Sequence, residues 1–239
     1  MTTHPMTSPR ATQIFRLDEA PLTSPIGERA WRSRSEPVDS FTSVATTNWH
    51  MVVVKQRGLA SLFVRGPETR ASSVAVPEDA EFLGMEFRLG TFMPQLPANQ
   101  LVDGAITMLA AGKRSFWLNG SVWELPIYDN VDVFLRRLLR KGVVARDTTV
   151  ETALRGRPTG QSTRSVQRRI RSATGLTHTM IKQIERARQA VTLLESGATI
   201  LDVVERAGYA DQPHLCRSVR RFIGHTPARI RRESCAAAT

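Results

Sequence analysis

Arginine supplies most of the chemistry available to the second part of this 239-residue chain. Residues 146–239 contain 17 Lys and Arg against 8 Asp and Glu, a net charge of +9, and Lys182 is the single lysine among them. Residues 1–145 contain 16 and 14, a net charge of +2, which completes the total of +11. A guanidinium group donates two parallel hydrogen bonds, a geometry that suits phosphate oxygens. A codon bias toward arginine would explain the scarcity of lysine, but the asymmetry itself indicates an anionic partner.

Metal or thiol chemistry has few candidate residues. The five histidines are His4, His50, His178, His214 and His225. Only His50 lies in the region expected to be β-rich, which excludes a multi-histidine metal site there. The two cysteines, Cys216 and Cys235, are too few for a disulfide framework and favour a reducing compartment. We therefore expect no enzyme activity, no catalytic residue, no metal and no cofactor.

The chain is expected to be soluble and cytoplasmic. Its longest apolar stretch, around Val52–Val54, falls far short of the roughly 20 residues that a membrane helix needs. Residues 1–10 lack the apolar segment of a secretory signal. Four prolines among Thr and Ser predict a flexible tail over residues 1–25.

Short strands separated by turn residues are predicted between residues 30 and 125. Trp49–Lys55 and Leu59–Arg65 flank Arg57-Gly58 as a hairpin. A second hairpin is centred on Asn119-Gly120, a pair that favours a type I′ turn. These features are typical of a small antiparallel barrel or sandwich.

A helical period follows over residues 129–141. The apolar positions are Val131, Phe134, Leu135, Leu138 and Leu139. Their spacing forms one face of a helix, which either packs on its own domain or pairs with a second copy in a dimer. Gly142 suits the end of this helix, and residues 142–148 are predicted to be a linker.

The remaining residues contain a repeat with a period of 49. Val166 aligns with Leu215, Arg168 with Arg217, and Gly175 with Gly224. Each copy has a short helix, a turn, a capping residue (Ser162 or Asp211), a basic helix and a glycine, which together predict a helix-turn-helix. The connecting helix carries an apolar stripe at Met180, Ile184, Ala187, Val191 and Leu194. At 1.5 Å per residue, residues 177–195 span about 28 Å. This length suits two basic helices in successive major-groove segments, about 34 Å apart.

The second copy resembles a known family of transcriptional regulators. Residues 200–227 read ILDVVERAGYADQPHLCRSVRRFIGHTP, which looks like the AraC/XylS signature. Residues 162–175 are similar to the upstream helix-turn-helix of that family. The resemblance covers about 147–233 and implies a sequence-specific regulator that binds a double-stranded DNA operator. Contact with RNA polymerase and assembly as a homodimer stay open.

The resemblance also implies site residues. Those presented to base edges are Arg164, Gln167, Arg168, Gln212, His214 and Arg217. Those that meet phosphates are Arg169, Arg171, Arg220 and Arg221. Arginine bonding to guanine and glutamine bonding to adenine agree with this assignment, and a solvent-exposed helix face is the alternative for each arginine. We assign Val166, Ile170, Leu215, Val219 and Phe222 to the core.

Two departures from the family pattern concern the turns. The first turn, Gly156–Gly160, is longer and richer in Pro and Gly, so the first unit is expected to sit differently or bind more weakly. Pro213 stands where the family often has a polar residue, and it has no backbone N–H to donate.

The expected fold class is α+β. Residues 26–141 form a β-rich sensor or dimerisation domain, a small cupin-like β-barrel followed by a helix; 142–148 form the linker; 149–233 form the DNA-binding domain of two helix-turn-helix units; 234–239 are a tail. Either an effector pocket or simple core packing explains the aromatic residues Trp49, Phe63, Phe92, Trp117 and Trp123.

Two alternatives to an effector-controlled regulator stay open. One is an effector-independent DNA-binding protein. The other is a DNA-repair protein whose thiol accepts a methyl group, which transfer of label from alkylated DNA to Cys216 or Cys235 would support.

Overall fold

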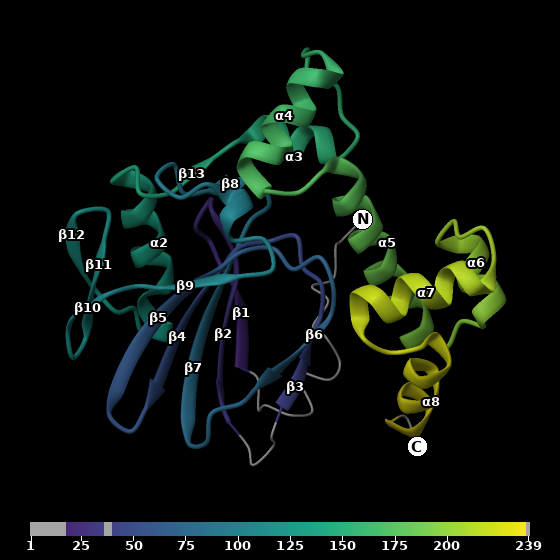
Figure 1. Cartoon of the computed structure of the whole chain (residues 1–239), viewed down its shortest axis with the longest axis horizontal. Coiled ribbons are helices and arrows are strands. Elements are labelled where there is room, and N and C mark those ends of the chain that lie inside the picture. Colours follow the sequence, from purple (N-terminus) through teal and green to yellow (C-terminus); the bar gives the residue numbers. More distant parts are fainter. Residues whose placement is uncertain (1–17, 36–39, 238–239) are drawn as a thin grey trace.

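A computed structural model describes residues 18–35 and 40–237 of the chain (Figure 1). The largest element is a six-stranded antiparallel sheet in the order β1-β2-β7-β4-β5-β9. Its strands are β1 (Asp18–Pro21), β2 (Gly27–Arg34), β4 (His50–Gln56), β5 (Leu59–Arg65), β7 (Ala80–Phe87) and β9 (Ala105–Thr107). β4 and β5 form the predicted hairpin, in which Arg57 and Gly58 both adopt positive φ.

The predicted closed barrel is not confirmed within the described residues. β1 and β9 lie at opposite edges of the sheet order and are not paired with each other, so the sheet is open, although strongly curved (Figure 1). The strand order also departs from the chain order, because β7 inserts between β2 and β4, and β9 adds to β5 at the far edge. Such non-local pairings are set by packing rather than by local turn signals.

A second sheet and a helix cover one side of the β-rich region. β10 (Ala110–Gly112), β11 (Ser115–Leu118) and β12 (Ser121–Glu124) form this sheet, and Asn119 and Gly120 make the predicted turn with positive φ at both positions. Helix α2 (Val131–Arg140) buries Val131, Phe134, Leu135 and Leu138 in the core of the same domain. Of the two predicted uses of this apolar face, the structure therefore has the internal one.

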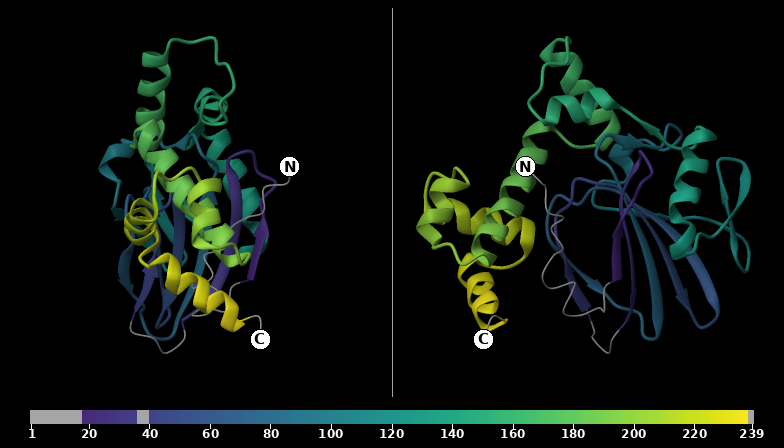
Figure 2. Two further views of the ribbon diagram at one scale, coloured as in Figure 1. Left: turned by 90° about the vertical axis from the view of Figure 1, so that its right-hand side faces the viewer. Right: turned by 180° about the vertical axis from the view of Figure 1, so that it is seen from behind.

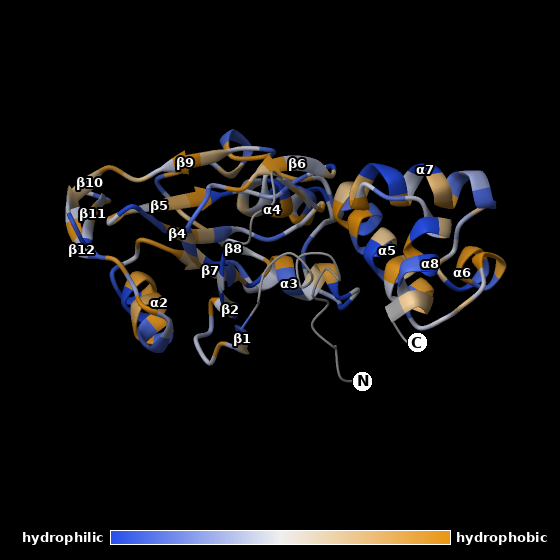
Figure 3. Cartoon of the chain, turned by 90° about the horizontal axis from the view of Figure 1, so that it is seen from below, coloured by the Kyte–Doolittle hydropathy of each residue, from blue (hydrophilic) through white to orange (hydrophobic). Residues whose placement is uncertain are grey.

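Six helices are described within residues 148–237. They are α3 (Thr148–Leu154), α4 (Thr163–Thr174), α5 (His178–Glu195), α6 (Ile200–Arg206), α7 (Gln212–Ile223) and α8 (Pro227–Ala237). The predicted repeat is confirmed, because the bounds of α4 moved by 49 residues are those of α7. The helices α5 to α8 stand beside the sheet rather than over it (Figures 2 and 3).

Short elements join the two regions. They are β3 (Ser40–Ser43) paired with β6 (Ser72–Ala75), β8 (Thr91–Phe92) paired with β13 (Ala145–Arg146), and the 3-10 helix η1 (Ala98–Gln100). A second 3-10 helix, η2 (Tyr128–Asn130), packs against α2 and β2 within the β-rich region. The predicted linker is thus anchored, since β13 lies within it and α3 begins at its last residue.

The two predicted tails also need correction. Residues 18–21 of the N-terminal tail form β1, which pairs with β2, while residues 1–17 lie outside the described residues. At the other end α8 extends to Ala237, so most of the predicted tail 234–239 is helical.

Candidate nucleic-acid interface

Matching caps hold α4 and α7 in place. The Ser162 hydroxyl accepts a hydrogen bond from the backbone N–H of Ser165 (3.2 Å), and the Asp211 carboxylate accepts one from that of His214 (2.6 Å). These bonds satisfy N–H groups that the first turn of a helix leaves without partners. Each helix ends at a left-handed glycine, Gly175 or Gly224. The two helices are therefore delimited in the same way.

The inward faces of both helices meet one hydrophobic core. Ile170 of α4 and Leu215, Val219 and Phe222 of α7 are buried there, as predicted. Val166 is only partly buried but packs against the same core. Burial on this face fixes which side chains point outward.

Five of the six predicted base-reading side chains lie on exposed positions. Arg164, Gln167 and Arg168 are exposed on α4, and Gln212 and Arg217 are exposed on α7. His214 differs, since it is half-buried and its ring packs edge-on against Tyr209 with centroids 5.1 Å apart. The His214 ring thus packs against Tyr209, next to the exposed side chains of Gln212 and Arg217.

The four predicted phosphate-binding arginines fall into two pairs. All four lie at exposed positions, but Arg169 and Arg221 also make contacts within the chain. Arg169 places its Nε 2.9 Å from the Asp147 carboxylate, and the Arg221 guanidinium lies over the Phe222 ring at 5.1 Å. Arg169 and Arg221 therefore already have partners within the chain.

The turns before α4 and the start of α7 show how the structure accommodates the two departures from the family pattern, the long first turn and Pro213. Residues 155–162 join α3 to α4, whereas only 207–211 join α6 to α7, and Gly156 and Gly160 turn the longer connection with positive φ. Pro213 lies in the first turn of α7, where the missing N–H has no intrahelical partner to lose.

Residues 157–233 match the family model described as a helix-turn-helix domain. They are an AraC-type helix-turn-helix domain. Such a domain is the DNA-binding part of a transcriptional regulator. A comparison with curated proteins found no match. Among solved structures, the chain is similar to ToxT from Vibrio cholerae, with 8% identity, a TM-score of 0.42, and coverage of 89% of this chain and 97% of that one.

Helix α5 is the connector inside the AraC-type domain. Its 18 residues correspond to about 27 Å at 1.5 Å per residue. Ile184, Ala187, Val191 and Leu194 are buried as predicted, while Met180 is only partly buried. Ile181, which the predicted stripe omits, is buried instead.

The five aromatic residues proposed for an effector pocket do not come together. Trp49 and Phe92 line one small recess with Val64, Phe87, Thr91, Met93 and Val144. Phe63 belongs to β5, where Leu62 and Val64 on the opposite face are the buried residues. Trp117 is exposed, and Trp123 is buried edge-on against Phe134. The recess has room for about one water molecule.

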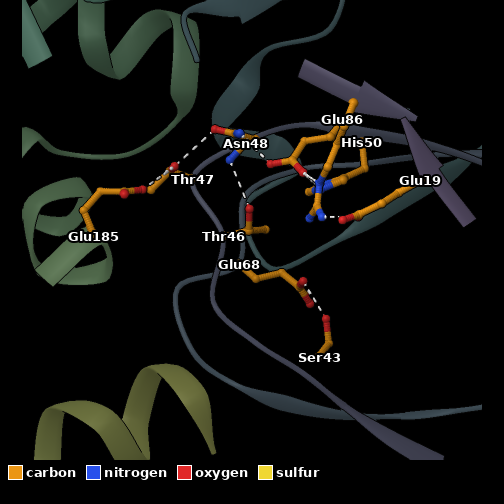
Figure 4. Close-up of polar contacts among 10 residues, drawn as sticks. Glu19, Ser43, Thr46, Thr47, Asn48, His50, Glu68, Glu86 and Glu185 are labelled. Carbon is orange, nitrogen blue, oxygen red and sulfur yellow. Dashed lines mark hydrogen bonds and ion pairs between the residues drawn. The ribbon is translucent and has the colours of Figure 1, made fainter. Parts of the chain in front are cut away.

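A buried charge cluster in the sheet is the main feature that sequence reasoning missed (Figure 4). The Glu86 carboxylate accepts hydrogen bonds from Arg29 Nε (2.6 Å) and Asn48 Nδ2 (2.7 Å). Burial opposes ionisation of Glu86, but the charge of His50, which is protonated at the low pH where Glu86 titrates, and the charge of Arg29 lower the pKa of Glu86 to about 2. Burial lowers the pKa of His50 to about 4, so its imidazole is neutral at pH 7. A glutamate within the otherwise apolar end of β7 was the available signal.

Other candidate chemistry is sparse in the described residues. Within residues 18–35 and 40–237 no group of three or more His, Cys, Asp and Glu is placed to hold a metal ion. Neither cysteine forms a disulfide bond within the described residues: Cys216 is half-buried on α7, and Cys235 is exposed on α8. In the same part of the chain, no helix combines the length and apolarity that crossing a bilayer requires.

Proposed function

We propose that this chain binds double-stranded DNA sequence-specifically, with α4 and α7 entering neighbouring segments of the major groove. One observation carries the proposal. Helices α4 and α7 occupy equivalent positions of the 49-residue repeat, have matching caps and leave polar side chains exposed. The AraC-type domain supports the DNA-binding part. The length of α5, about 27 Å plus its flanking turns, supports the groove spacing of about 34 Å.

The exposed side chains divide into two roles. Arg164, Gln167 and Arg168 of α4 and Gln212 and Arg217 of α7 read base edges, since arginine and glutamine form bidentate hydrogen bonds to guanine and adenine. Arg171 and Arg220 bind phosphates, which sets affinity more than specificity. The intrachain partners of Arg169 and Arg221 favour positioning over direct DNA contact.

Selection of duplexes from a random-sequence library by the full-length protein tests this proposal. The expected result is an enriched site in which footprinting detects two protected segments on one side of the duplex, about one helical turn apart. Enrichment of no sequence above the starting library, or protection of a single short segment, would contradict the proposal.

The N-terminal domain receives the regulatory signal in this proposal. The recess supports this part, because it is a gap in the packing of the domain core, and Trp49 lies in its lining as a natural fluorescent reporter. The surface that faces the recess is apolar, so we expect an apolar ligand group to pack there, and a ligand larger than water requires the lining side chains to move.

Tryptophan fluorescence titration against a metabolite panel tests the regulatory part. A response that is present in the wild type and lost in Trp49→Phe supports a ligand in the recess. A flat response across the panel favours the effector-independent regulator. Dimerisation and contact with RNA polymerase stay predictions from the sequence.

A further inference from the structure

The glycines that end α4 and α7 both lie against the N-terminal domain. A Cβ atom at Gly175 would lie 2.8 Å from Ala98 O and 2.6 Å from Val102 Cγ2. At the equivalent Gly224 it would lie 2.7 Å from Thr42 Cγ2 and 3.2 Å from Ala71 Cβ. The other glycines of the helical region with positive φ have no such neighbour within 4 Å; they are Gly156, Gly160, Gly197 and Gly208. The N-terminal domain therefore contacts the same position in both copies of the repeat, the glycine that ends the helix.

Backbone hydrogen bonds strengthen the contact with α7. The N–H of Ala45 donates to the carbonyl of Phe222 (2.7 Å), and the N–H of Ala71 donates to that of Arg221 (2.8 Å). Carbonyls in the last turn of a helix have no intrahelical donor, so another domain caps this helix end. The Thr47 hydroxyl also lies 3.2 Å from the Glu185 carboxylate of α5 (Figure 4).

Helix α4 is held by a different part of the same domain. η1 packs against α4, and Val102 and Phe92 pack against the core of the helical region. At the start of that region, Asp147 pairs with Arg169 of α4. Both recognition helices are thus docked while their base-reading side chains stay exposed.

Hydrogen bonds join the two docking points through the N-terminal domain. Thr46 and Glu68 exchange two backbone bonds of 3.0 and 2.9 Å. The Asp103 carboxylate accepts from both the N–H and the hydroxyl of Thr69, each at 2.6 Å, and the Asp103 N–H donates to Pro67 O (2.8 Å). A continuous hydrogen-bonded path therefore runs from the segment that caps α7 to the segment beside α4. We call residues 42–47, 66–71 and 98–103 the brace.

We infer that the brace fixes the distance and angle between α4 and α7, and so sets the spacing of the DNA sites that the chain accepts. This inference rests on the proposed function. Because docking leaves the reading faces exposed, the brace preorganises the pair of helices for DNA and does not cover them. Preorganisation raises affinity by reducing the ordering cost of binding.

Amide hydrogen exchange in the full-length protein tests the contact without DNA. The substitution Gly224→Ala places a methyl group against Thr42 and Ala71, and Gly208→Ala is its matched control, with the same kind of positive φ but open space around it. Protection of the Ala45 and Ala71 amides is expected in the wild type and in Gly208→Ala, with exchange at least about tenfold faster in Gly224→Ala. Unprotected amides in the wild type would overturn the inference even if DNA binding is established.

A duplex selected by the wild type, and the same duplex with one base pair inserted between its two halves, test the spacing. The wild type and Gly208→Ala should bind the inserted duplex at least about tenfold more weakly, and Gly224→Ala less than about threefold more weakly. Thr69→Val, which removes only the hydroxyl bond to Asp103, keeps the inference testable if Gly224→Ala does not fold, and should shift the ratio in the same direction. The inference would be overturned if the folded variants had the same ratio of affinities for the original and the inserted duplex as the wild type. It would also be overturned if the variants bound the original duplex more tightly than the wild type does.

Discussion

Arg168 and Arg217 occupy equivalent positions of the repeat, and both are exposed on the outward faces of α4 and α7. Arg168→Ala and Arg217→Ala should each weaken binding to the selected site by about 1–3 kcal/mol, because each would lose the bidentate contact with a base that we propose. Titration monitored by fluorescence anisotropy measures this loss. Arg232→Ala on α8, which also removes an exposed arginine, is the control and should bind like the wild type. Wild-type affinity in both test variants would show that the reading faces are misplaced.

Glu195 at the end of α5 carries a buried carboxylate oxygen without a partner among the described residues. Burial raises its pKa from 4.5 to about 7. The folded state therefore keeps a proton that the unfolded state loses, so the free energy of unfolding falls as the pH rises from 4.5 to 7. Glu195→Gln should raise that free energy by about 1 kcal/mol at pH 8, since the side chain is partly exposed and water screens its charge. Urea unfolding should give no difference at pH 4, and an equal gain at both pH values would contradict this explanation.

The caps are the element-scale feature with the clearest energetic consequence. Asp211→Ala removes the acceptor for the His214 N–H and should destabilise α7 by about 1 kcal/mol. Asp211→Asn keeps an acceptor at the same place and should lie close to the wild type. Thermal unfolding followed by circular dichroism compares the two variants. Equal stability of Ala and Asn at this position would show that the cap contributes nothing.

Local signals predicted the helices well and the sheet poorly. Ser162, Asp211, Gly175 and Gly224 define α4 and α7 through bonds within a few residues, which a sequence displays directly. The place of β7 between β2 and β4 depends instead on pairings across the domain. The Glu86 cluster was missed for the same reason, because its partner Arg29 lies 57 residues away.

At the scale of the whole molecule, the positive charge concentrated in residues 146–239 should make DNA binding strongly dependent on salt. The logarithm of the binding constant should fall linearly with the logarithm of the salt concentration. Arg171→Ala and Arg220→Ala should each reduce this slope by about 1 while leaving sequence preference intact. Titrations over a range of salt concentrations, on selected and scrambled duplexes, measure both quantities. A lost preference with an unchanged slope would assign these arginines to base reading instead.

The two copies of the repeat do not have separate interiors. Ile170 of α4, Ile184 of α5 and Val219 of α7 belong to one hydrophobic cluster, which even includes Ala45 from the N-terminal domain. A cluster of this kind melts as a unit. Both copies of the repeat should therefore unfold in a single calorimetric transition on heating. Neither copy, expressed alone, should fold independently.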